Sequence, residues 1–165
     1  EYGVHDPDLI ISAVLHDAVE DQSAKIVGNE DVSDNELTNQ KNALGILSER
    51  FGERVANTVN QLTTPEPPKE RSRKERNQLY YEHLLEVIEN PDSVLIKLSD
   101  FSDNALRLHV VTDSKRQKRL AKKYLPIFDL FLERIQRGDL PISMEKQQEL
   151  IQTLTLAKER CEKLT

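Results

Sequence analysis

Cysteine and long apolar runs are scarce in this chain, and each scarcity argues against a class of protein. The one cysteine, Cys161, cannot form an internal disulfide, which argues against a disulfide-rich secreted domain and favours a reducing compartment. No stretch approaches the roughly 18 consecutive apolar residues of a membrane-spanning helix, and no signal-peptide pattern opens the sequence. We therefore expect a soluble, cytoplasmic protein that has no membrane partner.

An excess of positive charge is also lacking. The formal net charge is −6, whereas a general nucleic-acid binder carries a basic footprint. We therefore expect no nucleic-acid partner. A local cluster of lysine and arginine can still bind a small phosphorylated molecule, because the electrostatic potential near such a cluster is positive even when the net charge of the chain is negative. The composition leaves the oligomeric state open.

What the chain does have is a succession of helix signals. Its 165 residues, with only five glycines, suit one helical domain. Asp6-Pro7 is a cap followed by proline at the first helical position, and the apolar pattern then runs to about residue 21. Residues 22–35 are polar and indicate a loop. Further helices are expected at 44–51, 55–63, 71–89, 94–108, 114–137 and, as a terminal helix, 142–164. The predicted fold is all-α, a single domain over 1–165.

Four ionisable side chains stand at the end of the first apolar segment. His16 and Asp17 lie within it, and Glu20 and Asp21 follow one turn later. At 100° per residue the four side chains fall on one continuous arc of a helix. A helix that is apolar all round belongs in an interior, and charges buried there must be paired or bound to a metal. The pattern predicts a buried cation site.

The predicted helix 94–108 repeats this arrangement. Asp100, Asn104 and Lys97 fall on one polar stripe of a segment whose other faces are apolar. Asp100 is the member of this stripe that can ligate a cation. Lys97 has two open roles, since it can pair with a carboxylate or with a phosphate.

Together the two segments supply a mixed set of metal ligands. The imidazole of His16 and the carboxylates of Asp17 and Asp100 suit one divalent ion of the Mn²⁺, Fe²⁺, Co²⁺ or Zn²⁺ type. Such an ion activates a bound water and polarises a phosphoryl oxygen. We expect Glu20 and Asp21, the predicted catalytic pair, to orient that water and carry its proton.

Three stretches in this order resemble a known family: LHDAVED, then FGERVANTVNQLT at 51–63, then KLSDFSDNAL at 97–106. They are similar to the HD-domain metal phosphohydrolases, and within them to the RelA/SpoT-type guanosine tetra/pentaphosphate (ppGpp) hydrolase branch with its small single-domain homologues. The resemblance covers roughly residues 1–130. It implies an HD-domain helical bundle around one buried divalent cation, usually Mn²⁺.

The resemblance also implies contacts to a nucleotide substrate. Asn104 matches an asparagine that contacts the nucleotide, and Tyr124 falls where the family has a tyrosine against the sugar and phosphate. Arg73 and Lys74, within the basic stretch 69–76, stand where family members carry cations near the phosphates. Lys97 belongs to the same predicted substrate-binding set.

The predicted function is that of a metal-dependent phosphohydrolase acting on a nucleotide, most of all on a guanosine 3′-pyrophosphate. Two alternatives stay open: a phosphatase of another nucleotide or dinucleotide cofactor, and a catalytically silent helical domain used for binding or regulation. The family's first metal-binding histidine would precede residue 1, so we expect the N-terminal helix to be missing from this chain. Residues 101–103 also depart from the family pattern, which bears on base specificity.

Overall fold

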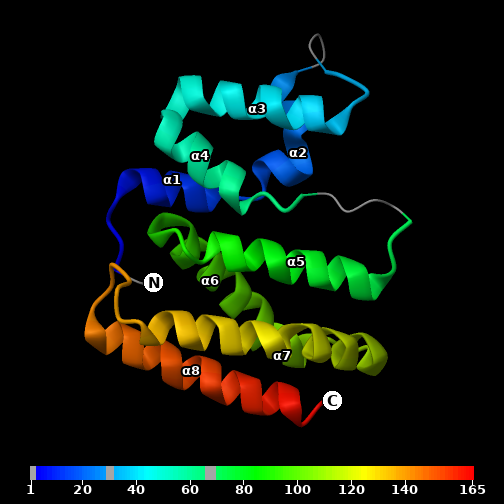
Figure 1. Cartoon of the computed structure of the whole chain (residues 1–165), viewed down its shortest axis with the longest axis vertical. Helices are drawn as coiled ribbons and strands as arrows, with labels where there is room; N and C mark the ends of the chain where they lie inside the picture. The colour runs from blue at the N-terminus through cyan, green and yellow to red at the C-terminus, as the bar shows by residue number, and fades with distance from the viewer. Residues whose placement is uncertain (1–2, 29–31, 66–69) are drawn as a thin grey trace. The chain divides into compact units, whose positions relative to one another are not determined.

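Every regular element that the structure describes is helical. The structure is a computed structural model that describes residues 3–28, 32–65 and 70–165, and Figure 1 shows its helices. The all-α prediction is confirmed for these ranges. Within them no helix is long and apolar enough to cross a membrane. The chain divides into an N-terminal unit, Val4–Lys69, and a C-terminal unit, Glu70–Thr165. That both belong to one HD domain stays a prediction.

Four helices make up the N-terminal unit. They are α1 (Pro7–Leu15), α2 (Ala18–Val27), α3 (Glu36–Phe51) and α4 (Glu53–Leu62). Helix α3 packs against both α2 and α4, and α4 packs in turn against α1. The core between them is small and aliphatic, with Val19, Ala43, Leu47, Val55 and Val59 at its centre.

The C-terminal unit contains α5 (Arg73–Val87), α6 (Pro91–Leu106), the short 3₁₀ helix η1 (Arg107–Val110), α7 (Ser114–Gln136) and α8 (Met144–Glu162). Helices α7 and α8 form an antiparallel hairpin, and α5 contacts both α6 and α7 (Figure 1). The core is aromatic at its centre. The ring of Phe101 lies 4.9 Å from that of Phe128 and 5.1 Å from that of Phe131, measured between centroids.

The prediction of one continuous helix to residue 21 is wrong. Helix α1 ends at Leu15, and α2 begins at Ala18 and continues to Val27, inside the segment expected to be a loop. The break has a local cause. The Nδ1 atom of His16 lies 2.8 Å from the carbonyl oxygen of Ala13, so the side chain satisfies a carbonyl at the helix end. The histidine that the sequence singles out therefore also ends its own helix.

Helix α6 begins three residues before the predicted position. The side chain of Asn90 accepts hydrogen bonds from the backbone N–H groups of Asp92 (2.8 Å) and Ser93 (3.2 Å), and Pro91 takes the first helical position. The sequence analysis left residues 90–93 outside both neighbouring helices. Asn90-Pro91 separates α5 from α6 and starts α6 at once, so the polar stripe stands on a longer helix than predicted.

Candidate functional site

The ring of His16 is oriented so that one nitrogen is available to a cation. Its Nδ1 atom donates its proton to the carbonyl oxygen of Ala13, since a carbonyl can only accept. In the neutral ring this leaves a lone pair on Nε2, which is buried and has no hydrogen-bond partner among the described residues. The Oδ2 atom of Asp17 lies 3.0 Å from Nε2. When the ring is protonated the two atoms form an ion pair. When it is neutral, the lone pair faces a carboxylate oxygen, and a cation bound to both atoms would relieve the repulsion.

The predicted burial of these charges holds for none of the four, and only the histidine is even half-buried. The His16 side chain is 21% exposed and that of Asp17 is 55% exposed. Glu20 and Asp21, at the start of α2, are exposed as well. The expectation is wrong for the three carboxylates because the preceding helix is not enclosed: Val14 of α1 is 78% exposed although it is apolar.

Glu20 is held by a residue that the sequence did not indicate. Its Oε2 atom accepts a hydrogen bond of 3.0 Å from the backbone N–H of Thr64, just after α4. This bond fixes one carboxylate oxygen and leaves the other to accept a proton. Thr64 lies 44 residues further along the chain, and no local pattern links the two positions. Packing among the helices of this unit brings them together.

Asp100 in α6 is oriented by two neighbours on the same helix. The Nδ2 atom of Asn104 donates a hydrogen bond of 2.8 Å to Oδ1 of Asp100, and Nζ of Lys97 lies 3.7 Å from Oδ2. The predicted polar stripe is confirmed. Lys97 is only 4% exposed, and of its two open roles the structure contains the pairing with a carboxylate. Any contact of this stripe with a nucleotide stays a prediction.

Tyr124 in α7 packs near the same stripe. Its ring meets that of Phe101 edge-on, with centroids 5.6 Å apart. Burial, followed by the negative charge of Asp100, raises the pKa of the Tyr124 phenol above its usual value. The hydroxyl therefore stays protonated and can donate a hydrogen bond at neutral pH. Its predicted contact with substrate is untested.

Arg73 and Lys74 occupy the first turn of α5 and line a groove with α7. The groove has a volume of about 590 Å³, and Lys122 and Lys123 line its other side. Lys69, the first residue of the predicted basic stretch, lies outside the described residues. The sequence analysis missed the two α7 lysines, because it did not predict which face of α7 meets α5.

Lys123 is the most confined cation of this groove. Its Nζ atom lies over the ring of Tyr80, 4.2 Å from the centroid. Burial and the nearby charge of Lys97 lower the pKa of Lys123, while Asp100 acts weakly in the opposite direction. Lys123 therefore lies close enough to Lys97 and Asp100 to feel the charge of both.

The predicted metal ligands belong to different units. His16 and Asp17 are in the N-terminal unit and Asp100 is in the C-terminal unit. Within either unit, the described residues contain no group of three or more His, Cys, Asp or Glu side chains that could hold a metal ion. The convergence of His16, Asp17 and Asp100 on one ion stays a prediction.

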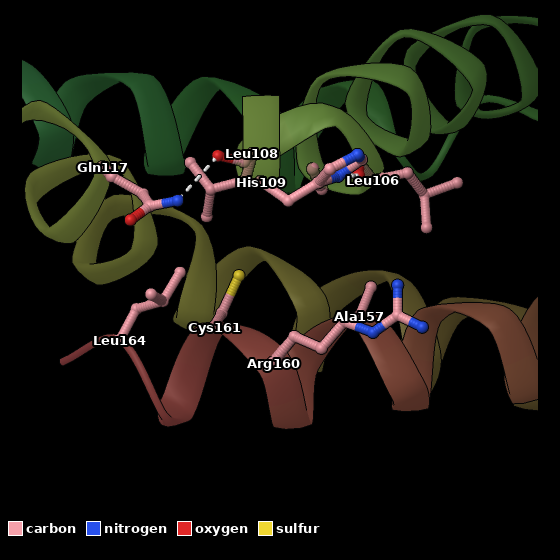
Figure 2. Close-up of a pocket in the computed structure, with 9 residues that line it drawn as sticks. Leu106, Leu108, His109, Gln117, Ala157, Arg160, Cys161 and Leu164 are labelled. Atoms are coloured by element: carbon pink, nitrogen blue, oxygen red, sulfur yellow. Dashed lines mark hydrogen bonds between the residues drawn. The ribbon is translucent and has the colours of Figure 1, made fainter. Parts of the chain in front are cut away.

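A second pocket lies within the C-terminal unit and is lined by none of these residues. Figure 2 shows it between α6–η1, α7 and α8, with the Cys161 sulfur facing into it and Gln117 hydrogen-bonded to the Leu108 carbonyl. Its volume is about 180 Å³ and its walls are mostly apolar. None of the predicted site residues lines it. Burial raises the pKa of the Cys161 thiol to about 11, so this cysteine is a poor nucleophile at neutral pH.

Comparison with known proteins finds a relative among hydrolases. The chain is 34% identical over 123 residues to the guanosine-3′,5′-bis(diphosphate) 3′-pyrophosphohydrolase of Aquifex aeolicus. The match covers 74% of this chain, and the chain spans about 15% of the length of that relative. No protein-family model matches the chain, and no solved structure does. The similarity supports a relationship to a nucleotide pyrophosphohydrolase.

Proposed function

We propose that this chain is a metal-dependent hydrolase of phosphorylated nucleotides, of the HD-domain type, and that its substrate is a guanosine 3′-pyrophosphate. The observation that carries the proposal is the 34% identity over 123 residues to a protein named for that reaction. The separate stretches LHDAVED and KLSDFSDNAL support it, because each supplies a carboxylate of the kind that divalent-ion hydrolases use.

His16 and Asp17 would hold the divalent ion, with Asp100 as the further ligand. The fit rests on the buried Nε2 of His16, which lacks a hydrogen-bond partner among the described residues and faces a carboxylate oxygen at 3.0 Å. One imidazole and two carboxylates suit Mn²⁺, Fe²⁺, Co²⁺ or Zn²⁺, and the resemblance to the HD-domain hydrolases favours Mn²⁺ among these four. When bound, the ion would supply a Lewis acid for the transfer of the 3′-pyrophosphoryl group to water, which releases pyrophosphate.

The neighbouring residues supply the proton transfer and the positioning. Glu20, with one oxygen held by the Thr64 N–H, accepts a proton from the attacking water through its other oxygen, and Asp21 assists. Asn104 fixes the carboxylate of Asp100 by its 2.8 Å hydrogen bond.

Tyr124 and the basic residues would bind the substrate. The Tyr124 phenol, kept protonated by burial, donates a hydrogen bond to the sugar or to a phosphate oxygen. Arg73 and Lys74 neutralise phosphate charge from the start of α5. Lys97 balances the charge of Asp100.

The proposal is tested by hydrolysis of guanosine tetraphosphate in Mn²⁺, with release of pyrophosphate as the readout. Wild type should turn over, and chelation of the ion should abolish turnover. Asp17→Ala should lose both bound Mn²⁺ and activity, because it removes a ligand. Glu20→Ala should keep Mn²⁺ and lose activity by about 10²-fold or more, because it removes only the proton acceptor.

Glu49→Gln is the matched control, since Glu49 is an exposed carboxylate of α3 remote in sequence from the motif. It should retain both metal and turnover. If wild type hydrolyses another phosphorylated nucleotide and leaves guanosine tetraphosphate intact, the substrate assignment is wrong. If wild type neither binds Mn²⁺ nor hydrolyses any nucleotide, the chain is a helical binding domain and the hydrolase proposal is abandoned.

A further inference from the structure

The pocket beside Cys161, between α6–η1, α7 and α8, is larger than the gaps that packing normally leaves in a protein. Its volume is about 180 Å³, whereas well-packed interiors hold few voids larger than a water molecule. Two buried alanines stand in its wall, Ala105 of α6 and Ala157 of α8. Each ends at its methyl group, so neither fills the space between the helices. We call this volume the Cys161 pocket.

The inner wall of the Cys161 pocket is apolar. Leu108 and Cys161 are buried, and the sulfur faces the pocket in Figure 2. Because burial raises the pKa of the Cys161 thiol to about 11, the wall carries no thiolate charge at neutral pH. Apolar cavities of about 150 Å³ stay free of water and bind benzene. This wall therefore suits a hydrocarbon group of about six carbon atoms.

The opening of the pocket carries positive charge. Arg160 is one of its two exposed lining residues, and Figure 2 shows the side chain extending from α8 toward the end of α6. Arg160 forms no ion pair with the residues that the structure describes. The nearby Glu162 lies 3.9 Å from Nζ of Lys158 instead, and none of the described acidic side chains lines the pocket. The guanidinium donors are therefore available to a ligand.

His109 is the other exposed lining residue, and it is held in place by the backbone. Its Nδ1 atom donates a 2.8 Å hydrogen bond to the carbonyl oxygen of Leu106, which fixes the ring and leaves Nε2 for another partner. Gln117 of α7 donates a 3.2 Å hydrogen bond to the carbonyl oxygen of Leu108. Both bonds fix the turn between α6 and α7 that forms one wall. The pocket is thus formed without a ligand, which lowers the entropy that binding would cost.

We propose that the Cys161 pocket binds a small apolar carboxylate, with its hydrocarbon part against Ala105 and Ala157 and its carboxylate on Arg160. A guanidinium pairs with a carboxylate through two parallel hydrogen bonds, and such charge-assisted bonds are stronger than neutral ones. A whole nucleotide does not suit the pocket, because its volume of about 180 Å³ lies below the roughly 300 Å³ at which sites for larger ligands begin.

This proposal is independent of the hydrolysis proposed above. The Cys161 pocket shares no lining residue with the groove between α5 and α7. It also contains none of the residues to which we assign the metal, the proton transfer or the substrate. Failure of the hydrolase proposal would therefore leave this one standing, and the reverse is also true.

The test is a nuclear magnetic resonance titration of the isotope-labelled full chain with hexanoate, in EDTA. Backbone amide signals detect weak binding and also locate it. We expect saturable shifts at Leu108, Ala157 and Cys161. Hexanol should bind about tenfold more weakly, because it keeps the apolar contact and loses the charge-assisted hydrogen bonds. Hexylamine should bind more weakly still, since Arg160 repels its ammonium group.

Two variants separate the two parts of the site. Arg160→Gln should weaken hexanoate by about tenfold and leave hexanol unchanged, because only the charged contact is lost. Ala157→Leu should abolish binding of both, because the longer side chain fills the pocket. Circular dichroism checks the fold, and Cys161→Met fills the pocket from the same helix if Ala157→Leu unfolds. The matched control is Arg50→Gln, at an exposed position of α3, which should bind as wild type does.

Each contrary result overturns a stated part of the proposal. Absence of saturable shifts in wild type, shifts confined to other residues, or unchanged hexanoate binding in the variant that fills the pocket would show that the pocket is no ligand site. Equal affinities of hexanol and hexanoate, or no loss in Arg160→Gln, would refute the carboxylate assignment. An equal loss in Arg50→Gln would assign the effect to general electrostatics.

Discussion

The Nδ2 atom of Asn104 donates a 2.8 Å hydrogen bond to Oδ1 of Asp100, four residues earlier on α6. The same nitrogen lies 3.0 Å from the Asp100 backbone carbonyl oxygen, so the amide is anchored at two points. On the other side, Nζ of Lys97 lies 3.7 Å from Oδ2. The carboxylate that we propose as a metal ligand is therefore held in one orientation by its own helix.

Removal of this support should weaken the metal site without removing a ligand. We expect Asn104→Ala to lower the affinity for Mn²⁺ by about tenfold, because residues that orient a ligand typically contribute 10- to 100-fold. Equilibrium dialysis against Mn²⁺ measures the change. Asn42→Ala, at an exposed position of α3, is the control. An unaltered affinity in Asn104→Ala would mean that Asp100 does not ligate the ion.

The Tyr124 hydroxyl should act on substrate rather than on folding. Tyr124→Phe keeps the edge-on contact with Phe101 at 5.6 Å between centroids, so we expect its urea midpoint to match that of wild type. The KM for guanosine tetraphosphate should rise by about tenfold, the effect of one lost hydrogen bond to a charged group. Steady-state kinetics separate KM from kcat. A lower urea midpoint with unchanged KM would assign the hydroxyl to packing.

Arg134 should be among the most costly residues of the C-terminal unit to replace. Its side chain is 2% exposed, and its Nε donates a 2.7 Å hydrogen bond to the carbonyl oxygen of Ile88 at the end of α5. Arg134→Met keeps the volume but removes the donor and the partner of Asp139. We expect the free energy of unfolding to fall by about 2–4 kcal/mol. Urea denaturation measures this, and a loss below about 0.5 kcal/mol would contradict it.

The ion pair between Arg134 and Asp139 should also make the free energy of unfolding depend on pH in the acid range. The hydrogen bond from Arg134 lowers the pKa of Asp139 below its usual value of 3.8. A carboxyl whose pKa is lowered by folding stabilises the native state above its unfolded pKa, and that stability is lost as pH falls through the folded pKa.

The unfolding free energy of wild type should therefore decline more steeply below about pH 4 than that of Asp139→Asn. Urea denaturation at a series of pH values gives the two slopes. Asp34→Asn, at an exposed position before α3, should keep the wild-type slope. Identical acid slopes for wild type and Asp139→Asn would show that the pair forms no stabilising contact.

Cys161 should be nearly unreactive in the folded protein. It is 1% exposed, and burial raises the pKa of its thiol to about 11. Only the thiolate reacts with iodoacetamide, so at pH 8 alkylation should be more than about 100-fold slower in native protein than in urea. As the only cysteine of the chain, it gives an unambiguous readout by mass. Rapid labelling of native protein at pH 8 would mean that the α6–α8 packing opens readily.

Helix ends were predictable where their signals are local. The side chain of Asp6 accepts a 3.0 Å hydrogen bond from the Asp8 N–H, as the Asp6-Pro7 signal predicts, and α3 ends where Gly52 adopts a positive φ of 93°. Each of these two signals acts on backbone only a few residues away in the sequence. The ring of His16 acts locally too, but its bond to the Ala13 carbonyl was hidden by the continuous apolar pattern around it.

The polar stripe of α6 was likewise contained in the sequence, because a helix repeats its faces at fixed intervals. Asp100, Asn104 and Lys97 needed only the helical period to be placed together, and they are in contact as predicted. Whether Asp17 and Glu20 are buried or exposed could not be predicted from the sequence. Burial depends on which neighbours cover a helix, and both carboxylates are exposed.

By itself, then, the sequence determined the all-helical fold, the capped start of α1 at Asp6 and the residues that share a helix face, because all three depend on spacings of a few residues. Tertiary structure decided which faces meet. Only packing brings the Thr64 N–H to Glu20, and only packing aligns Arg73 of α5 with Lys122 of α7 along one groove. The physical reason is that such contacts depend on the summed burial of many apolar side chains, which no pair of residues encodes locally.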